Sequence, residues 1–295
     1  MGVSKRMRYA YFFIAPFFII YLIFTVYPMF YSIYLSFCNV DPLTGNTSWI
    51  GLANYGRLFS SPYFLESIGN TLIIWIMSII PQLTIAFSLS LLLHNKWFKG
   101  RFILRNIYYF PNLVTPVTVG LLFGALFAFP GGSINQILAL FGLESVDFQH
   151  SPFLAQVVIS IAICWKNFGY NIIYFTAALH SIPDDIYEAA EVDGVNWFQK
   201  AVKITIPMMR PMLMYVLITS VIGGLQIFDE AKLVFKDVPG NATTTMVKYL
   251  YDTTFDRLQF GYGAAIAVGI FLVILVATGI TLLLTRAFGE RKEAH

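Results

Sequence analysis

Long apolar stretches alternate with short polar ones along the whole chain. Residues 9–40 contain no charged side chain, and residues 67–93 form a second uncharged stretch. A helix needs about 20 apolar residues to cross the hydrocarbon core of a bilayer, so both stretches are long enough to span it. The apolar core of a cleavable signal peptide is shorter than the first stretch, which is therefore expected to be a retained span at about 10–37.

Four further segments follow the same pattern. The expected spans are about 10–37, 67–93, 107–129, 153–179, 211–228 and 261–285. Pro81 lies inside the second, where neighbouring helices can satisfy the backbone group that it frees. The sequence thus predicts an all-α polytopic membrane protein with six transmembrane helices. We expect one transmembrane domain over residues 1–295, with its core at about 67–286.

The composition agrees with this pattern. Hydrophobic residues make up 57% of the chain and charged residues 12%, with a mean hydropathy of +0.68, which is far too apolar for a soluble domain. Cys38 and Cys164 both lie in apolar stretches, and the four histidines show no metal-like spacing, so we expect no disulfide and no metal site. The net charge of +3 comes with no basic face for nucleic acid.

Lysine and arginine are distributed unevenly over the polar segments. Six spans place both termini and the loops after spans two and four on one side, which holds thirteen lysines and arginines against five on the other. Cytoplasmic loops of membrane proteins carry the excess of these residues. The sequence therefore predicts that both termini and the polar segment 181–207 are cytoplasmic.

Segment 181–207 has the pattern of a helix, a turn and a second helix. Ser181 followed by Asp184 resembles a capping box, and five acids lie between positions 184 and 193. Gly194 supplies a position at which the chain can turn, and Pro207 ends the helical spacing that follows. These features predict a short, bent, amphipathic element. Physical chemistry alone leaves open that it is an interfacial loop without a specific role.

The spacing within this segment resembles the EAA motif of ATP-binding-cassette importer permeases. Its usual form is EAA, two residues, DGA, eight residues and I-x-L-P; here EAA starts at Glu188, DGV starts at Asp193 and ITIP ends at Pro207. The departures are Val195 for Ala and Ile206 for Leu, both apolar. The resemblance covers nearly the whole chain and is to the carbohydrate-importer branch, similar to the maltose permease F chain and the glycerol-3-phosphate permease A chain. The loop after the first span lacks the large insertion of the maltose F chain.

The resemblance implies an assembly in a bacterial or archaeal plasma membrane. Its expected partners are a second, distinct permease subunit, two cytoplasmic ABC ATPases that bind ATP and magnesium, an extracytoplasmic solute-binding protein and a sugar. This chain would hold no cofactor of its own and no catalytic residue. Segment 181–207 would be the coupling element, with its ATPase-coupling residues at Glu188, Ala189, Ala190, Glu191, Asp193 and Gly194.

Polar residues within the spans are the candidates for binding substrate. Counting back from Glu188, Asn167 and Tyr170 fall where the maltose F chain places sugar-contacting residues, and Gln226 and Asn112 occupy similar positions less securely. Amides and aromatic faces suit the hydroxyls and apolar faces of a sugar. The alternative for these polar groups is hydrogen bonding between helices.

Lys166 is the clear ionisable side chain within a span. Intramembrane charges are often functional, but a lysine can also snorkel or pair structurally, so both interpretations remain open.

Three classes of function are compatible with six spans. A permease subunit driven by separate ATPases accounts for the absence of any G-x-x-x-x-G-K-[ST] sequence. A secondary transporter would usually have internal repeats and ion-coupling acids in the membrane, and a membrane enzyme would need a cluster of reactive side chains. The expected function is that of a permease for a sugar or oligosaccharide working by alternating access. A glycerol phosphate is the alternative solute.

Overall fold

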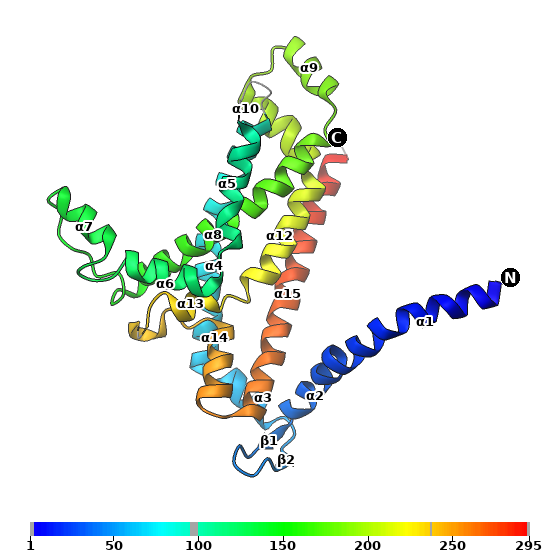
Figure 1. The fold of residues 1–295 in the computed structure, drawn as a ribbon, viewed down its shortest axis with the longest axis vertical. Coiled ribbons are helices and arrows are strands. Elements are labelled where there is room, and N and C mark those ends of the chain that lie inside the picture. The colour runs from blue at the N-terminus through cyan, green and yellow to red at the C-terminus, as the bar shows by residue number, and fades with distance from the viewer. Residues whose placement is uncertain (1–2, 95–99, 237, 294–295) are drawn as a thin grey trace. The chain divides into compact units, whose positions relative to one another are not determined.

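The computed structural model describes residues 3–94, 100–236 and 238–293 (Figure 1). Lys96 and Lys99, which contribute to the predicted cytoplasmic charge, lie outside the described residues. In chain order the helices and strands are α1 (Val3–Tyr21), α2 (Tyr27–Ser36), β1 (Cys38–Val40), β2 (Thr47–Trp49), α3 (Ala53–Ser60), α4 (Pro62–His94), α5 (Arg101–Leu113), α6 (Pro116–Leu126), α7 (Ser133–Leu140), α8 (Pro152–His180), α9 (Asp184–Val192), α10 (Trp197–Lys200), α11 (Ile206–Met208), α12 (Arg210–Gly224), α13 (Asp229–Leu233), α14 (Met246–Tyr251) and α15 (Phe260–Glu293).

Five described segments are helical, long and apolar enough to cross a membrane. They are Tyr11–Ser36, Pro62–His94, Pro152–His180, Arg210–Leu233 and Phe260–Thr285. A sixth candidate consists of the pair α5 and α6, which are bent by 93° relative to each other. Five of the six expected spans therefore correspond to such helices, the sixth corresponds to the bent pair, and the architecture is that of an all-α polytopic membrane protein.

The third expected span, 107–129, is broken in the middle. Thr115 is the N-cap of α6, with extended backbone angles, and Pro116 starts that helix. A residue before proline is disfavoured in the helical region, and proline has no N–H to continue the helix before it. The Thr115 hydroxyl accepts a hydrogen bond from the backbone N–H of Thr118 at 3.3 Å, which stabilises the new start. This local chemistry, which the hydropathy pattern does not register, causes the bend.

The fifth span is also discontinuous and reaches further than expected. Helix α12 ends at Gly224, and α13 starts at Asp229. The apolar segment runs to Leu233 instead of ending at residue 228, so that Asp229 and Glu230 belong to it. Two consecutive glycines at the end of α12 have poor helix propensity and favour a break there.

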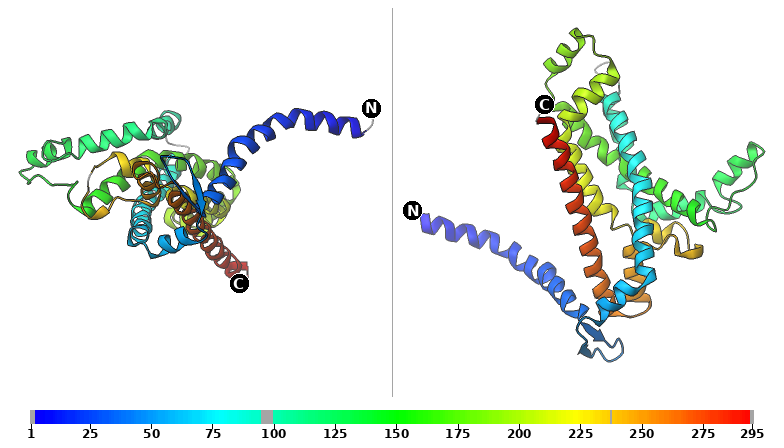
Figure 2. Two further views of the ribbon diagram at one scale, coloured as in Figure 1. Left: turned by 90° about the horizontal axis from the view of Figure 1, so that it is seen from below. Right: turned by 180° about the vertical axis from the view of Figure 1, so that it is seen from behind.

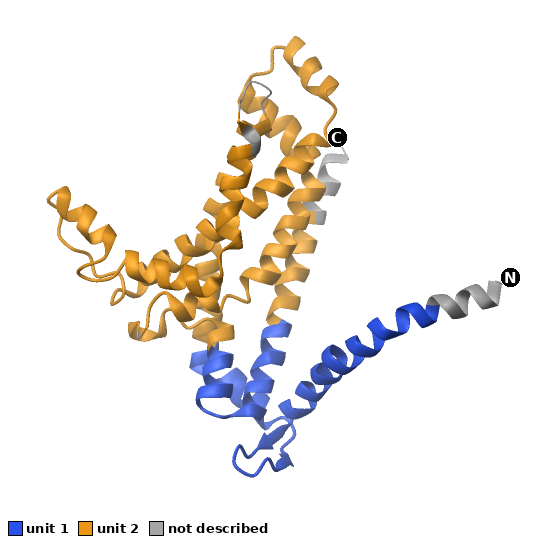
Figure 3. Ribbon diagram, in the orientation of Figure 1, with its two compact units in different colours: residues 1–64, 249–272 blue, residues 65–248, 273–295 orange. Residues whose placement is uncertain are grey.

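The chain divides into two compact units, coloured separately in Figure 3. Unit 1 comprises residues 1–64 and 249–272, and unit 2 comprises residues 65–248 and 273–295. In unit 1, strands β1 and β2 form an antiparallel hairpin. The buried amide of Asn54 donates hydrogen bonds to the carbonyls of Ser36 and Cys38 at 2.9 and 3.0 Å, which ties α3 to the end of α2 and to the hairpin.

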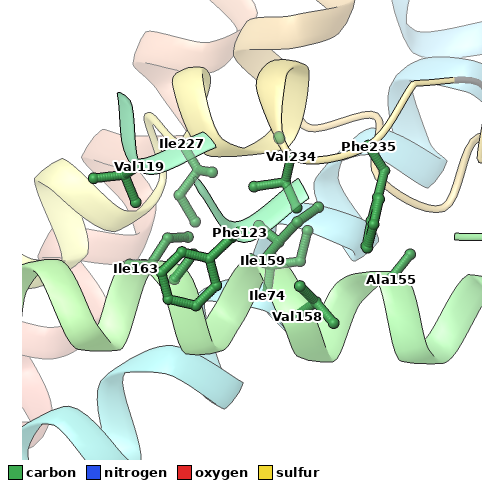
Figure 4. Close-up of a cluster of buried hydrophobic side chains, with 12 residues drawn as sticks. Ile74, Val119, Phe123, Ala155, Val158, Ile159, Ile163, Ile227, Val234 and Phe235 are labelled. Carbon is green, nitrogen blue, oxygen red and sulfur yellow. The ribbon is translucent and has the colours of Figure 1, made fainter. Parts of the chain in front are cut away.

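Helix α8 forms the centre of unit 2. One buried cluster joins it to α4, α6 and the segment 227–235, and Figure 4 shows α8 side chains directed at those of α6 and of that segment. The cluster consists of Ile74, Val119, Phe123, Ala155, Val158, Ile159, Ala162, Ile163, Ile227, Ala231, Val234 and Phe235. Because lipid tails are as apolar as these side chains, close van der Waals packing rather than escape from water holds such helices together.

Helices α5 and α8 approach each other very closely at Gly169. A Cβ atom at this position would lie 1.9 Å from the carbonyl oxygen of Tyr108 and 2.6 Å from its carbonyl carbon. Only glycine allows this contact, as at other helix crossings in membranes where small residues bring backbones together. The C-terminal end of α8 leads into α9 and α10, which lie at one end of unit 2 (Figure 2).

Candidate functional site

A cavity of about 420 Å³ opens within unit 2, between α4, α8, α12 and the start of α13. Its lining residues are Trp75, Ser78, Ile79, Gln82, Ile163, Lys166, Asn167, Tyr170, Asn171, Val216, Thr219, Ser220, Gly223, Gly224, Gln226, Ile227, Phe228, Asp229 and Glu230. The residues contributed by α8 are three or four positions apart, so one face of that helix forms a wall. The broken part of the fifth span supplies the opposite wall.

Three of the four predicted substrate residues line this cavity. Asn167 and Tyr170 come from α8, and Gln226 lies in the break between α12 and α13. Asn112 is half-buried near the end of α5 and is not among the lining residues. The structure thus brings Asn167, Tyr170 and Gln226 together and leaves Asn112 apart from them.

Lys166 has a partner inside the apolar part of unit 2. Its Nζ lies 3.8 Å from Oε1 of Glu230, and the two side chains are 15% and 11% exposed. The expected fifth span ended at about residue 228, which left Glu230 outside it and Lys166 as the clear ionisable side chain within a span. The extension of the fifth span through α13 corrects this, because it carries Glu230 to the level of Lys166.

The two amides on the cavity wall are oriented by their own helices. The Asn167 amide nitrogen donates to the carbonyl of Ile163 at 2.9 Å, and that of Gln226 donates to the carbonyl of Ile222 at 2.8 Å. A carbonyl can only accept, so these bonds fix which end of each amide is the nitrogen. The amide oxygens remain available as acceptors.

Aromatic side chains complete the wall. Tyr170 and Tyr174 share a hydrogen bond between their hydroxyls, and their rings meet edge to face with centroids 4.7 Å apart. The indole N–H of Trp75 donates to the hydroxyl of Ser220 at 3.1 Å, which connects α4 to α12 across the cavity. Such an arrangement presents flat apolar faces beside polar groups, as sites for polyhydroxylated ligands do.

Segment 181–207 folds as two helices with a turn between them. Helix α9 ends near Asp193, and Gly194 has a φ of +73°, a backbone conformation that glycine adopts without strain. The predicted helix–turn–helix is therefore present. The capping box lies elsewhere than expected: Asn196 and Gln199 form one at the start of α10. The Ser181 hydroxyl instead donates to the carbonyl of Ala178 at 2.7 Å, at the end of α8.

The six residues expected to couple to an ATPase differ in exposure. Those on the surface of α9 and the turn are Glu188, Ala189, Glu191, Asp193 and Gly194. Ala190 is only 5% exposed and packs inside the chain. The carboxylate of Glu191 pairs with Lys200 of α10 at 2.6 Å, so this acid helps to fix the two helices to each other.

Segment 181–207 also carries a group of exposed apolar side chains that was not predicted to belong to the site. Val192 is 89% exposed, and Trp197 and Phe198 are each 67% exposed. The sequence does not reveal which way these side chains face, because that depends on how the two helices pack. Behind them, the hydroxyls of Tyr187 and Thr205 are 3.1 Å apart and join α9 to the π-helical segment Ala201–Thr205.

The chain matches the model of a known protein family. The model for the binding-protein-dependent transport system inner membrane component matches residues 7–290, nearly the full length. This chain belongs to that family. The match includes the cavity, the 181–207 segment and the two units, and it agrees with the resemblance that the EAA spacing carries.

Characterised members of the family are similar over almost the whole chain. The arabinooligosaccharides transport system permease protein AraP of Halalkalibacterium halodurans is 34% identical over 278 residues, covering 93% of this chain and 87% of that protein. The lactose transport system permease protein LacF of Rhizobium radiobacter is 33% identical, covering 95% and 94%. A crystal structure of a bacterial ABC transporter involved in the import of the acidic polysaccharide alginate matches with a TM-score of 0.84 at 26% identity, covering 96% of each chain.

Proposed function

We propose that this chain is a permease subunit of an ATP-driven importer of sugars or oligosaccharides. The observation that carries the proposal is the cavity, in which amides and aromatic rings gather on the wall built by α8 and the broken fifth span. Family membership supports a transport role, and the similar proteins AraP and LacF have names that refer to glycans. Transport proteins of this kind bind their solute between helices near the middle of the membrane.

The assembly that we propose contains this chain, a second and distinct permease, two cytoplasmic ATPases and an extracytoplasmic solute-binding protein. ATP and magnesium would be bound by the ATPases. Glu188, Ala189, Glu191, Asp193 and Gly194 would form the cytoplasmic surface that contacts an ATPase, together with the exposed side chains of Val192, Trp197 and Phe198, and the buried Ala190 would support this surface from within. Apolar side chains at the centre of a patch with charges at its rim are typical of protein interfaces.

Coupling would follow from the way this element is held. The ion pair of Glu191 with Lys200 and the hydrogen bond of Tyr187 with Thr205 connect α9 to α10 and to the segment behind it. A push on α9 would therefore move the neighbouring ends of α8 and α12 as rigid bodies. The cavity lies between these two helices, so their movement would open it to one side of the membrane and then to the other.

The proposal is tested by ATP-driven sugar uptake in vesicles that contain the reconstituted complex. We expect Glu188→Ala to lower uptake about tenfold or more while the chain remains inserted, because an exposed charge at the docking surface is lost. Asp185→Ala is the matched control, since Asp185 is also an exposed acid in α9 but lies outside the EAA spacing. Uptake that is unchanged in Glu188→Ala and in an additional Trp197→Ala variant would contradict the assignment of this surface.

A further inference from the structure

The charges around the cavity restrict the chemistry of its ligand. Its lining contains three charged side chains among the described residues, Lys166, Asp229 and Glu230. Lys166 is engaged by Glu230 at 3.8 Å, whereas Asp229 has no ion pair within the part of the chain that the structure describes. The formal charge of the lining is therefore −1, and its cation is already neutralised.

Several hydrogen-bond donors on the lining are engaged within the protein. The amide nitrogens of Asn167 and Gln226 donate to backbone carbonyls, as do the hydroxyls of Thr219 at 2.8 Å and Ser78 at 2.9 Å. The indole N–H of Trp75 donates to Ser220. The oxygens of these amides and the carboxylate of Asp229 remain as acceptors that face the cavity.

We propose that this cavity selects sugars without an anionic group and excludes acidic ones, with Asp229 as the specificity-determining residue. Neutral sugar hydroxyls can each donate to an acceptor, and an amino group can do so with a favourable charge. The carboxylate of a uronic acid only accepts, so it would meet acceptor oxygens and the like charge of Asp229 while Lys166 is held by Glu230.

This inference rests on the proposed transport function and narrows it. Similarity to other transport proteins does not determine whether the substrate is charged, because similar systems import both uncharged and acidic glycans. The buried amide nitrogen of Asn171, in a side chain only 5% exposed, has no hydrogen-bond partner in the described structure and lines the same cavity. One such uncharged donor suits a hydroxyl oxygen, but it is too weak to compensate the repulsion of a carboxylate.

The test compares trigalacturonate with its fully methyl-esterified form, which has the same sugar skeleton but carries uncharged methyl esters in place of the carboxylates. Binding is measured by saturation-transfer NMR on the complete permease–ATPase complex in lipid nanodiscs, without the binding protein, which would impose a selectivity of its own. We expect the esterified form to bind at least about tenfold more tightly than the acid, since a like charge in a site of reduced dielectric is worth at least that factor. Equal affinity would overturn the proposal.

Two variants locate the effect. Asp229→Asn should strengthen trigalacturonate binding about tenfold and leave the ester within about threefold, and Glu230→Gln, which frees Lys166, should also favour the acid. Glu144→Gln is the matched control, because it removes one carboxylate from an exposed loop away from the cavity. Variants that shift both ligands alike would contradict the role of Asp229. Failure of all sugars to bind would contradict the transport function itself, whereas equal binding of both contradicts only the charge selection.

Discussion

Nζ of Lys166 lies 3.8 Å from Oε1 of Glu230, across the gap between α8 and α13. The two residues come from different apolar helical segments, Pro152–His180 and Arg210–Leu233, and both side chains are largely buried in the apolar part of unit 2. Burying an unpaired charge in such a place costs a large free energy of desolvation. Each of the two charges is therefore tolerated because the other pairs with it. The pair also forms part of the cavity wall.

Removing one member of this pair should destabilise the protein strongly. Lys166→Met leaves the Glu230 carboxylate buried without its cation, and we expect a loss of about 3 kcal/mol in the free energy of unfolding. The double change Lys166→Met with Glu230→Gln removes both charges and should restore most of that loss. Unfolding in detergent, followed as a double-mutant cycle, measures the coupling. Additive effects of the two single changes would show that the residues do not interact.

Gly169 should tolerate no side chain. In Gly169→Ala the new methyl group would meet the carbonyl of Tyr108, and α5 would have to move away from α8. Overpacking of this kind costs about 1–3 kcal/mol, which thermal unfolding in detergent would detect. Gly279→Ala in α15 is the control, because a Cβ there would have no neighbour within 4 Å. Similar unfolding of the two variants would contradict the close approach of α5 and α8.

Tyr170 should affect transport more than assembly. Tyr170→Ala removes an aromatic face and a hydroxyl from the cavity, so we expect sugar uptake to fall about tenfold while the ATPase still copurifies with the chain. Tyr170→Phe keeps the ring and should lose less. Ile173→Ala, an exposed position of the same helix outside the cavity lining, serves as the control. Equal loss of uptake and of ATPase association would indicate that Tyr170 supports the structure instead.

Much of the architecture was predictable because lipid imposes it. Every apolar stretch of sufficient length became a span, since a backbone in hydrocarbon must satisfy its hydrogen bonds internally and a helix does this within one segment. The turn in segment 181–207 was predictable because Gly194 adopts a positive φ without strain. Pro207 was expected to end the second helix and does not, because it lies in the first turn of α11, where its missing N–H is tolerated. The end of the fifth span was misjudged, because Asp229 was taken as a limit.

The candidate site was predictable only in part. Asn167 and Tyr170 were found through their distance from Glu188, which is a relation along one chain segment. Glu230 was missed, and Asn112 was predicted to line the cavity but does not. The positions of these two side chains depend on how spans far apart in the sequence pack against each other. A one-dimensional pattern contains no information on which helix faces which.

By itself, the sequence determined that this protein is helical, that it spans a membrane about six times, and that it carries the EAA spacing of importer permeases. These properties follow from composition, hydropathy and local backbone preference. Only the tertiary structure decided that α5 and α8 meet at Gly169, that Ala190 packs inward while Trp197 faces out, and that Lys166 meets Glu230 beside the cavity. The physical reason is that burial and charge pairing arise from contacts between distant segments, and these contacts exist only after the helices have packed.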